Sequence, residues 1–226
     1  SAGYTLSTRT LVLTVGANDL AQSASCVFTI SNALTPSSVV GVNNVEARTR
    51  DSQDKDVDST SSMATDQIVT GSLTSATFAT AVDTPGYESV ATVSFTTAGR
   101  VEVGGKVVLV MPDESGAQYG WRFMDGPALV TLATETSGTS NAPTITFTTP
   151  SSNTPLAGSV GYTLGTRTLV LTLDVNGLKQ SASHVFTVWH ALTPSSVVGV
   201  NHAQALTQDS QGKNVDTTSS MATDQI

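Results

Sequence analysis

Apolar and polar residues alternate along most of the chain, and this period of two predicts β-strands. Residues 90–96 and 144–148 place Thr or Ser on one face and Val, Ile or Phe on the other, and residues 9–15 alternate in a similar way. This pattern is typical of antiparallel sheets with one wet face. Residues 106–111 are apolar on both faces and predict a central strand that ends at Pro112. Since no window shows helical periodicity beyond a turn or two, we expect an all-β protein.

A long internal repeat organises the chain. Residues 1–68 return as residues 159–226, and 49 of the 68 positions are identical at an offset of 158 residues. Solenoid repeats have periods of roughly 20–50 residues, so this period favours an array of whole domains. The chain holds one full period and part of a second. We therefore expect it to represent part of a longer tandem array.

The boundary between units is predicted at residues 68/69. Residues 50–66 are polar and weakly patterned, and a strand-like segment follows them. With this boundary, residues 69–226 form one complete repeat and residues 1–68 are the C-terminal half of a preceding repeat. An alternative break near residue 158 would give alternating smaller units of 68 and 90 residues. We favour the first boundary, because 68 residues with about four strands bury little surface alone.

Several strand and turn motifs carry a family resemblance that covers the whole period. They are TGSLTSATF at 70–78, VATVSFTTAGRVEVGGKVVLVMP at 90–112, PTITFTTP at 143–150, RTLVLTL at 167–173 and SHVFTVWHALTP at 183–194. In their order they resemble the tandem Ig-like β-sandwich repeats of very large extracellular proteins of algae, other protists and bacteria. The resemblance implies Ig-like antiparallel β-sandwich domains in tandem and an extracellular or cell-surface location. It implies no catalytic residues.

Composition narrows the functional classes. The net charge is −8 and only 12% of residues are charged. A negative chain without basic patches argues against nucleic acid and anionic membrane partners. No apolar run approaches the roughly 18 residues that span a bilayer. We therefore expect a structural module of an extracellular filament or stalk whose partners are neighbouring copies of the same repeat.

The best candidate metal site is an acidic cluster. Asp54, Asp56 and Asp58 alternate along the chain and offer the oxygen ligands that calcium prefers. Calcium at a junction between extracellular domains would stiffen it. The second copy has Gly212 and Asn214 at the first two of these positions, so a solvated acidic turn is the competing interpretation.

Three aromatic residues offer a candidate ligand surface. Tyr119, Trp121 and Phe123 lie at alternate positions in a Gly-rich region, so a strand would place them on one side. Exposed aromatic rings stack on sugars, which makes an adhesin or carbohydrate-binding module the alternative function. The competing interpretation is that the three side chains fill one end of the domain core.

Glycosylation is the remaining chemistry that the sequence suggests. No Asn is followed by the N-glycan acceptor pattern. Ser and Thr residues close to proline are candidate O-glycan acceptors, since such segments often carry O-glycans. These candidates are Ser37, Ser38, Thr149, Ser151, Ser152 and Thr154.

The cysteine and the histidines give no catalytic or zinc site. Cys26 is the only cysteine, and His184 takes its place in the second copy. A position that accepts either residue is neither half of a disulfide framework nor a fixed ligand. His184 and His190 lie six residues apart, about 20 Å along a strand, which is too far to share one metal ion. No nucleophile elbow or phosphate-binding loop is present, so we expect no enzyme activity.

Overall fold

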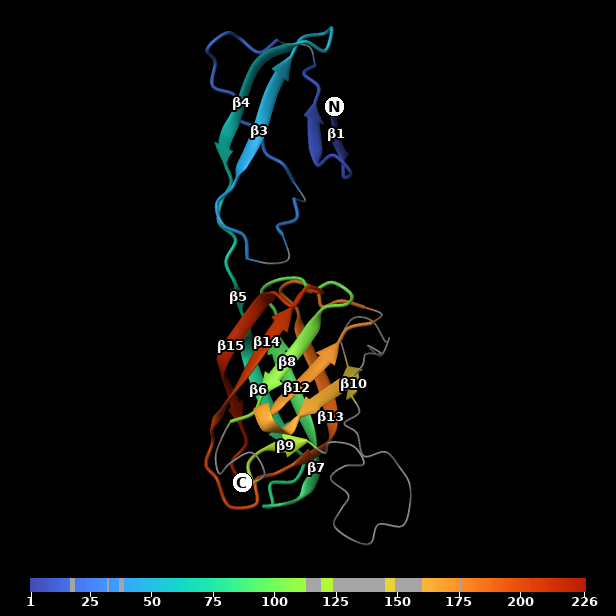
Figure 1. Ribbon diagram of the computed structural model, residues 1–226, viewed down its shortest axis with the longest axis vertical. Helices are drawn as coiled ribbons and strands as arrows, with labels where there is room; N and C mark the ends of the chain where they lie inside the picture. The colour runs from blue at the N-terminus through green and yellow to red at the C-terminus, as the bar shows by residue number, and fades with distance from the viewer. Residues whose placement is uncertain are drawn as a thin grey trace. The chain divides into compact units, whose positions relative to one another are not determined.

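A computed structural model describes residues 1–16, 19–31, 33–36, 39–112, 119–123, 145–148, 160–174 and 176–226 of the chain (Figure 1). Its regular structure consists of strands and one short 3-10 turn, so the all-β class is confirmed for the described residues. The chain divides into two compact units, Ser1–Thr35 and Pro36–Ile226. We describe each unit by itself.

The first unit contains one antiparallel hairpin. Strand β1 (Ala2–Thr5) pairs with β2 (Thr10–Leu13) from Ala2 opposite Leu13 to Thr5 opposite Thr10. The turn closes through Arg9, whose φ of 53° lies in the left-handed region and whose amide donates to the Leu6 carbonyl at 3.2 Å. No residue from 24 to 31 belongs to a strand.

The second unit begins with a separate hairpin of β3 (Asn44–Arg50) and β4 (Asp56–Ala64). Its turn is held by Asp51, whose side-chain oxygen accepts hydrogen bonds from the amides of Gln53 and Lys55 at 2.8 and 2.9 Å. Such an Asx turn explains why the polar stretch reverses direction here.

The remaining strands form one eleven-stranded sheet. The path of hydrogen-bonded neighbours is β10-β13-β7-β6-β15-β14-β8-β12-β11, with β5 beside β15 and β9 beside β13. Every pairing is antiparallel except those of β5 and β6 with β15. In Figure 1 this sheet curves around a single interior and is nearly closed, like a barrel. The strands are β5 (Gly71–Ser72), β6 (Thr74–Thr80), β7 (Glu88–Thr96), β8 (Lys106–Val110), β9 (Arg122–Phe123), β10 (Ile145–Thr148), β11 (Val160–Thr163), β12 (Thr168–Thr172), β13 (Ser183–Leu192), β14 (His202–Gln208) and β15 (Asn214–Thr223).

The core follows from the alternation in the sequence. In β7, Val93 and Phe95 are buried, while the residues between and beside them are more exposed. Strand β8 lies between β12 and β14, and Val107, Val108 and Leu109 are all buried, which confirms the predicted central strand. Burying each such side chain contributes roughly 1.5–3 kcal/mol, so these strands supply much of the stability of the sheet.

The two copies of the repeat form the same hairpins in the same register. Strands β1 and β2 correspond to β11 and β12, where Val160 again lies opposite Leu171. Strands β3 and β4 correspond to β14 and β15, and the pairing shifts register at equivalent places in both copies. The difference is that the strands of the second copy belong to the large sheet, whereas those of the first form isolated hairpins. The described residues therefore form one nearly closed, barrel-like sheet and two separate hairpins, and Ig-like sandwich domains in tandem stay a prediction from the resemblance.

Candidate interaction surface

The first unit exposes apolar side chains whose second-copy equivalents form the core. We call Leu11, Leu13, Phe28 and Ile30 the unit-1 face; all four are exposed. Leu13 is 42% exposed but its equivalent Leu171 only 2%, and Phe28 is 62% exposed but Phe186 only 1%. Residues of the same type are thus buried in one copy and open to solvent in the other.

The burial in the second copy comes from strands of residues 69–112. In β12, Leu169 lies opposite Leu109 of β8 and Leu171 opposite Val107. In β13, Phe186 lies opposite Val93 of β7. Because Leu11, Leu13 and Phe28 take the places of these three residues in the first copy, the unit-1 face lacks the equivalents of β7 and β8.

The β3–β4 hairpin of the second unit repeats this contrast. We call Val45 and Met63 the hairpin face. Val45 and Met63 lie opposite each other, and both are exposed. Met63 is 48% exposed, whereas its equivalent Met221 is fully buried in the large sheet. The first copy thus leaves exposed a position at which the second copy buries the same residue type.

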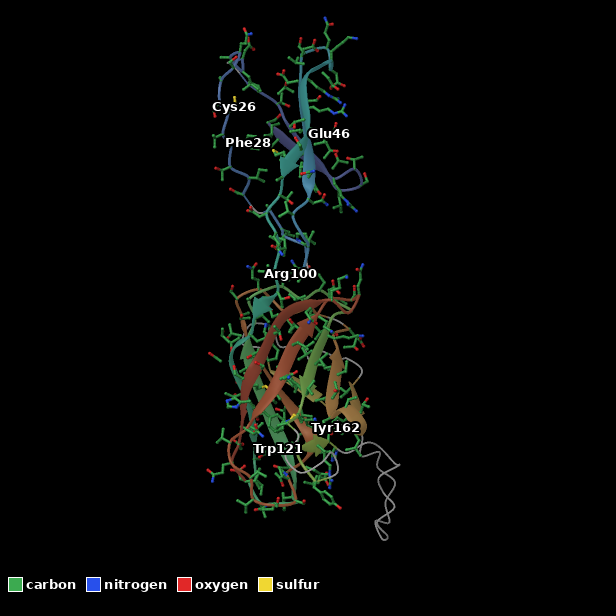
Figure 2. All side chains as sticks on the ribbon, turned by 60° about the vertical axis from the view of Figure 1, so that its left-hand side comes forward. Cys26, Phe28, Glu46, Arg100, Trp121 and Tyr162 are labelled. Atoms are coloured by element: carbon green, nitrogen blue, oxygen red, sulfur yellow. The ribbon has the colours of Figure 1, made fainter. Side chains whose placement is uncertain are left out.

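The segment around Cys26 gives the clearest difference between the copies. Residues 22–31 and 180–189 differ at only three positions, yet residues 183–189 lie in β13 and residues 24–31 form no strand. Strand β13 exists because it pairs with β7 along most of its length. Figure 2 shows Cys26 and Phe28 on the extended segment of the first unit. Local sequence therefore permits the strand, and a partner strand produces it.

The thiol of Cys26 and the imidazole of His184 have opposite surroundings. Cys26 is exposed. His184 is buried, its Nε2 lies 3.4 Å from the Lys179 carbonyl oxygen, and its ring lies 5.9 Å from that of Phe95. Burial lowers the pKa of His184, and the contact with Lys179 only partly opposes this effect.

Asp216 in β15 carries a buried carboxylate that the sequence did not lead us to expect. Asp216 accepts hydrogen bonds from the Gly99 amide at 3.0 and 3.1 Å, and its own amide donates to Thr207 Oγ1 at 3.1 Å. Burial raises the pKa of Asp216, and the hydrogen bonds from Gly99 partly offset it. The first copy keeps the Thr–Asp pair as Thr49 and Asp58, but Asp58 is exposed. The signal in the sequence was that this Asp stays in the second copy while its two acidic neighbours change.

The predicted calcium ligands contact basic and hydroxyl groups. Asp54 lies 2.9 Å from Arg50, Asp56 contacts both Arg50 at 2.9 Å and Arg48 at 2.8 Å, and Asp58 accepts from Thr49 Oγ1 at 3.2 Å. Asp54 and, to a smaller extent, Asp56 raise the pKa of Arg50. The pKa of Arg48 is raised chiefly by Glu46, which also contacts its guanidinium group. Within the described ranges no group of three or more His, Cys, Asp or Glu side chains is arranged to hold a metal ion. Calcium binding here stays a prediction that the arginine contacts do not favour.

The aromatic residues do not share one exposed surface. Tyr119 is 51% exposed, but Trp121 and Phe123 are fully buried. Phe78 packs edge-on against both buried rings, with centroids 5.3 Å from Trp121 and 6.1 Å from Phe123. Tyr162 packs against Phe123 at 5.3 Å, and Figure 2 shows Trp121 and Tyr162 within the larger sheet. The expectation of a three-ring ligand surface is therefore corrected, because two of the rings complete the core.

The O-glycan candidates lie outside the described residues. This holds for Ser37, Ser38, Thr149, Ser151, Ser152 and Thr154. O-glycosylation at these positions stays a prediction from the sequence.

The described part of the chain defines an all-β protein with a repeated strand set and two exposed apolar faces in the first copy. No protein-family model matches the chain, and no curated protein is found to be similar to it. None of the described helical segments is long and apolar enough to cross a membrane.

Proposed function

We propose that the chain is a structural module of an extracellular filament or cell-surface stalk, built from tandem Ig-like repeats of 158 residues. The observation that carries the proposal is the repeat itself, in which 49 of 68 positions and the hairpin registers of both copies agree. Closely similar units in series suit an extended assembly. In this proposal residues 69–226 are one repeat, and residues 1–68 belong to another.

The strand order of the large sheet supports an Ig-like repeat. In Ig-like sandwiches the first two strands share a sheet with two later strands, and the third strand shares the other sheet with the last two. Here β6 and β7 join β13 and β10, whereas β8 joins β14 and β15. Strands β12 and β11 extend the second set beside β8, the edge at which variable-type domains add strands, but they follow β10 in the chain, which departs from the variable-type order. The short parallel pairing of β6 with β15 links the two sets into one continuous sheet.

The structure favours the alternative function, a carbohydrate-binding module, less than the sequence did. It depended on three exposed aromatic rings, and only Tyr119 is exposed. A single exposed tyrosine is common on protein surfaces. A glycan array tests the alternative: the absence of any wild-type signal would remove it, and equal binding by Tyr119→Ala would remove the role of Tyr119.

Electron microscopy of the assembly purified from its natural source tests the structural proposal. We expect elongated filaments or stalks with an axial repeat that reflects successive β-domains. A dispersed population of isolated globular particles would contradict the proposal.

A further inference from the structure

We propose that residues 1–68 are an acceptor for a half-repeat with the sequence type of residues 69–158, supplied by a polypeptide segment other than this chain's own residues 69–158. The inference rests on the proposed repeat array and identifies the contact that joins the two halves of a repeat. The half-repeat adds strands equivalent to β6, β7 and β8 and covers the unit-1 face and the hairpin face.

The second copy shows which contacts the half-repeat makes. At the equivalent positions, Leu11 comes to lie opposite a residue of the Leu109 type and Leu13 opposite one of the Val107 type. Phe28 comes to lie opposite a residue of the Val93 type, since its equivalent Phe186 pairs there. Every one of these pairs is buried in the second copy.

Polar groups of residues 1–68 are also placed to bind the same half-repeat. Asp58 and Thr49 already contact each other as Asp216 and Thr207 do. A residue of the Gly99 type from the half-repeat then donates its amide to Asp58, as Gly99 does to Asp216. A Cβ on Gly99 would lie 2.6 Å from Val215 Cγ1, so the close approach at this contact needs a glycine. The acceptor therefore selects its partner by a specific backbone contact as well as by apolar area.

The chain's own residues 69–158 are already engaged by its second copy. Strand β6 pairs with β15, β7 pairs with β13, and β8 pairs with β12 and β14. If these strands covered residues 1–68 instead, they would expose Leu169, Leu171 and Phe186, which are buried now.

If two copies of this chain exchanged their 69–158 segments, no additional apolar surface would be buried. These 226 residues hold one segment of the 69–158 type and two segments that fit it, residues 1–68 and 159–226. A second copy of them that covered residues 1–68 of the first would have to uncover its own residues 159–226. The acceptor therefore needs a half-repeat that no other C-terminal half already covers.

Titration of the full chain with a 69–158 fragment tests the proposal, with the thiol of Cys26 as the reporter. Cys26 is the only cysteine and is exposed, whereas its equivalent His184 is buried. We expect one fragment to bind per chain by native mass spectrometry. Reaction of Cys26 with a maleimide should slow about tenfold or more at saturation, because labelling then requires local opening.

Matched variants separate this contact from unspecific association. A Val93→Asp fragment should neither bind nor protect Cys26, and the chain variant Phe28→Asp should lose protection by the wild-type fragment. If the free fragment aggregates, residues 69–158 are fused directly before residue 1. Because residue 1 is the equivalent of residue 159, the fusion has the same order of segments as residues 69–226. Cys26 should then be protected in the fusion itself.

Three outcomes would overturn the proposal. Cys26 could stay fully reactive in the fusion; the Val93→Asp fragment could protect it equally well; or the full chain alone could form a dimer that protects it. The result is independent of the filament proposal. Protection of Cys26 without filaments would leave the acceptor intact, whereas filaments with a reactive Cys26 would refute the acceptor alone.

Discussion

At the scale of single residues, the repeat supplies its own controls, because equivalent side chains occupy different surroundings. His184 is buried where Cys26 is exposed, and Asp216 is buried where Asp58 is exposed. A substitution at each buried member can therefore be compared with a natural counterpart in the same chain.

Replacing His184 by the Cys of the first copy should remove a pH dependence of stability. Burial lowers the pKa of His184, so the unfolded state binds this proton more tightly than the folded state does. The free energy of unfolding therefore falls as pH drops through the ordinary histidine range toward the lower folded pKa. In His184→Cys the loss between pH 7.5 and 5 should be smaller, as measured by urea unfolding followed by tryptophan fluorescence. The exposed His202, changed to Asn as in the first copy, is the control, and an equal reduction there would refute the assignment.

Removing the carboxylate of Asp216 should destabilise the large sheet. Asp216→Ala leaves the part-buried Gly99 amide without its acceptor, which costs about 1–3 kcal/mol. Asp58→Ala changes an exposed side chain and should alter the free energy of unfolding by no more than about 0.5 kcal/mol. Denaturant unfolding of both variants measures the difference. Equal effects would mean that the Gly99 contact does not stabilise the sheet.

At the scale of elements, the alternation of residues identified most strands but not their partners. It predicted β7, the central strand β8 and the strand at Ile145–Thr148. It could not separate residues 24–31 from β13, since their sequences are almost the same and only β13 pairs with β7. It left Trp121 and Phe123 open between a ligand surface and the core, because aromatic spacing alone does not reveal that Phe78 packs on both rings.

The turn before β8 should tolerate no side chain at Gly105. A Cβ there would lie 2.4 Å from Val101 Cγ1 and 2.6 Å from the Gln208 carbonyl oxygen. Gly105→Ala should therefore lower the free energy of unfolding by about 1–3 kcal/mol, as overpacking does. Gly161→Ala in β11 is the matched control, since a Cβ there meets nothing within 4 Å. Equal melting temperatures of the two variants would show that the turn accommodates the added methyl group without loss of stability.

At the scale of the whole molecule, we propose that residues 69–226 are one folding unit and residues 1–68 an incomplete one. The repeat indicated this division, whereas the two compact units of the structure meet at Thr35 and Pro36. The boundary at residues 68/69 stays a prediction. The sequence alone could not determine this boundary, because nearly the same residues form a strand in one copy and no strand in the other, depending on whether a partner strand is present.

The most direct test is a comparison of two recombinant fragments, residues 69–226 and residues 1–68, by size-exclusion chromatography and urea unfolding. We expect 69–226 to be a monomer with one cooperative transition, since it contains the whole large sheet and its core. We expect 1–68 alone to be unfolded or to aggregate, because the unit-1 face and the open strand edges have no cover. A dispersed, cooperatively folded β-domain formed by 1–68 alone would refute the division at residues 68/69 and favour alternating units of 68 and 90 residues.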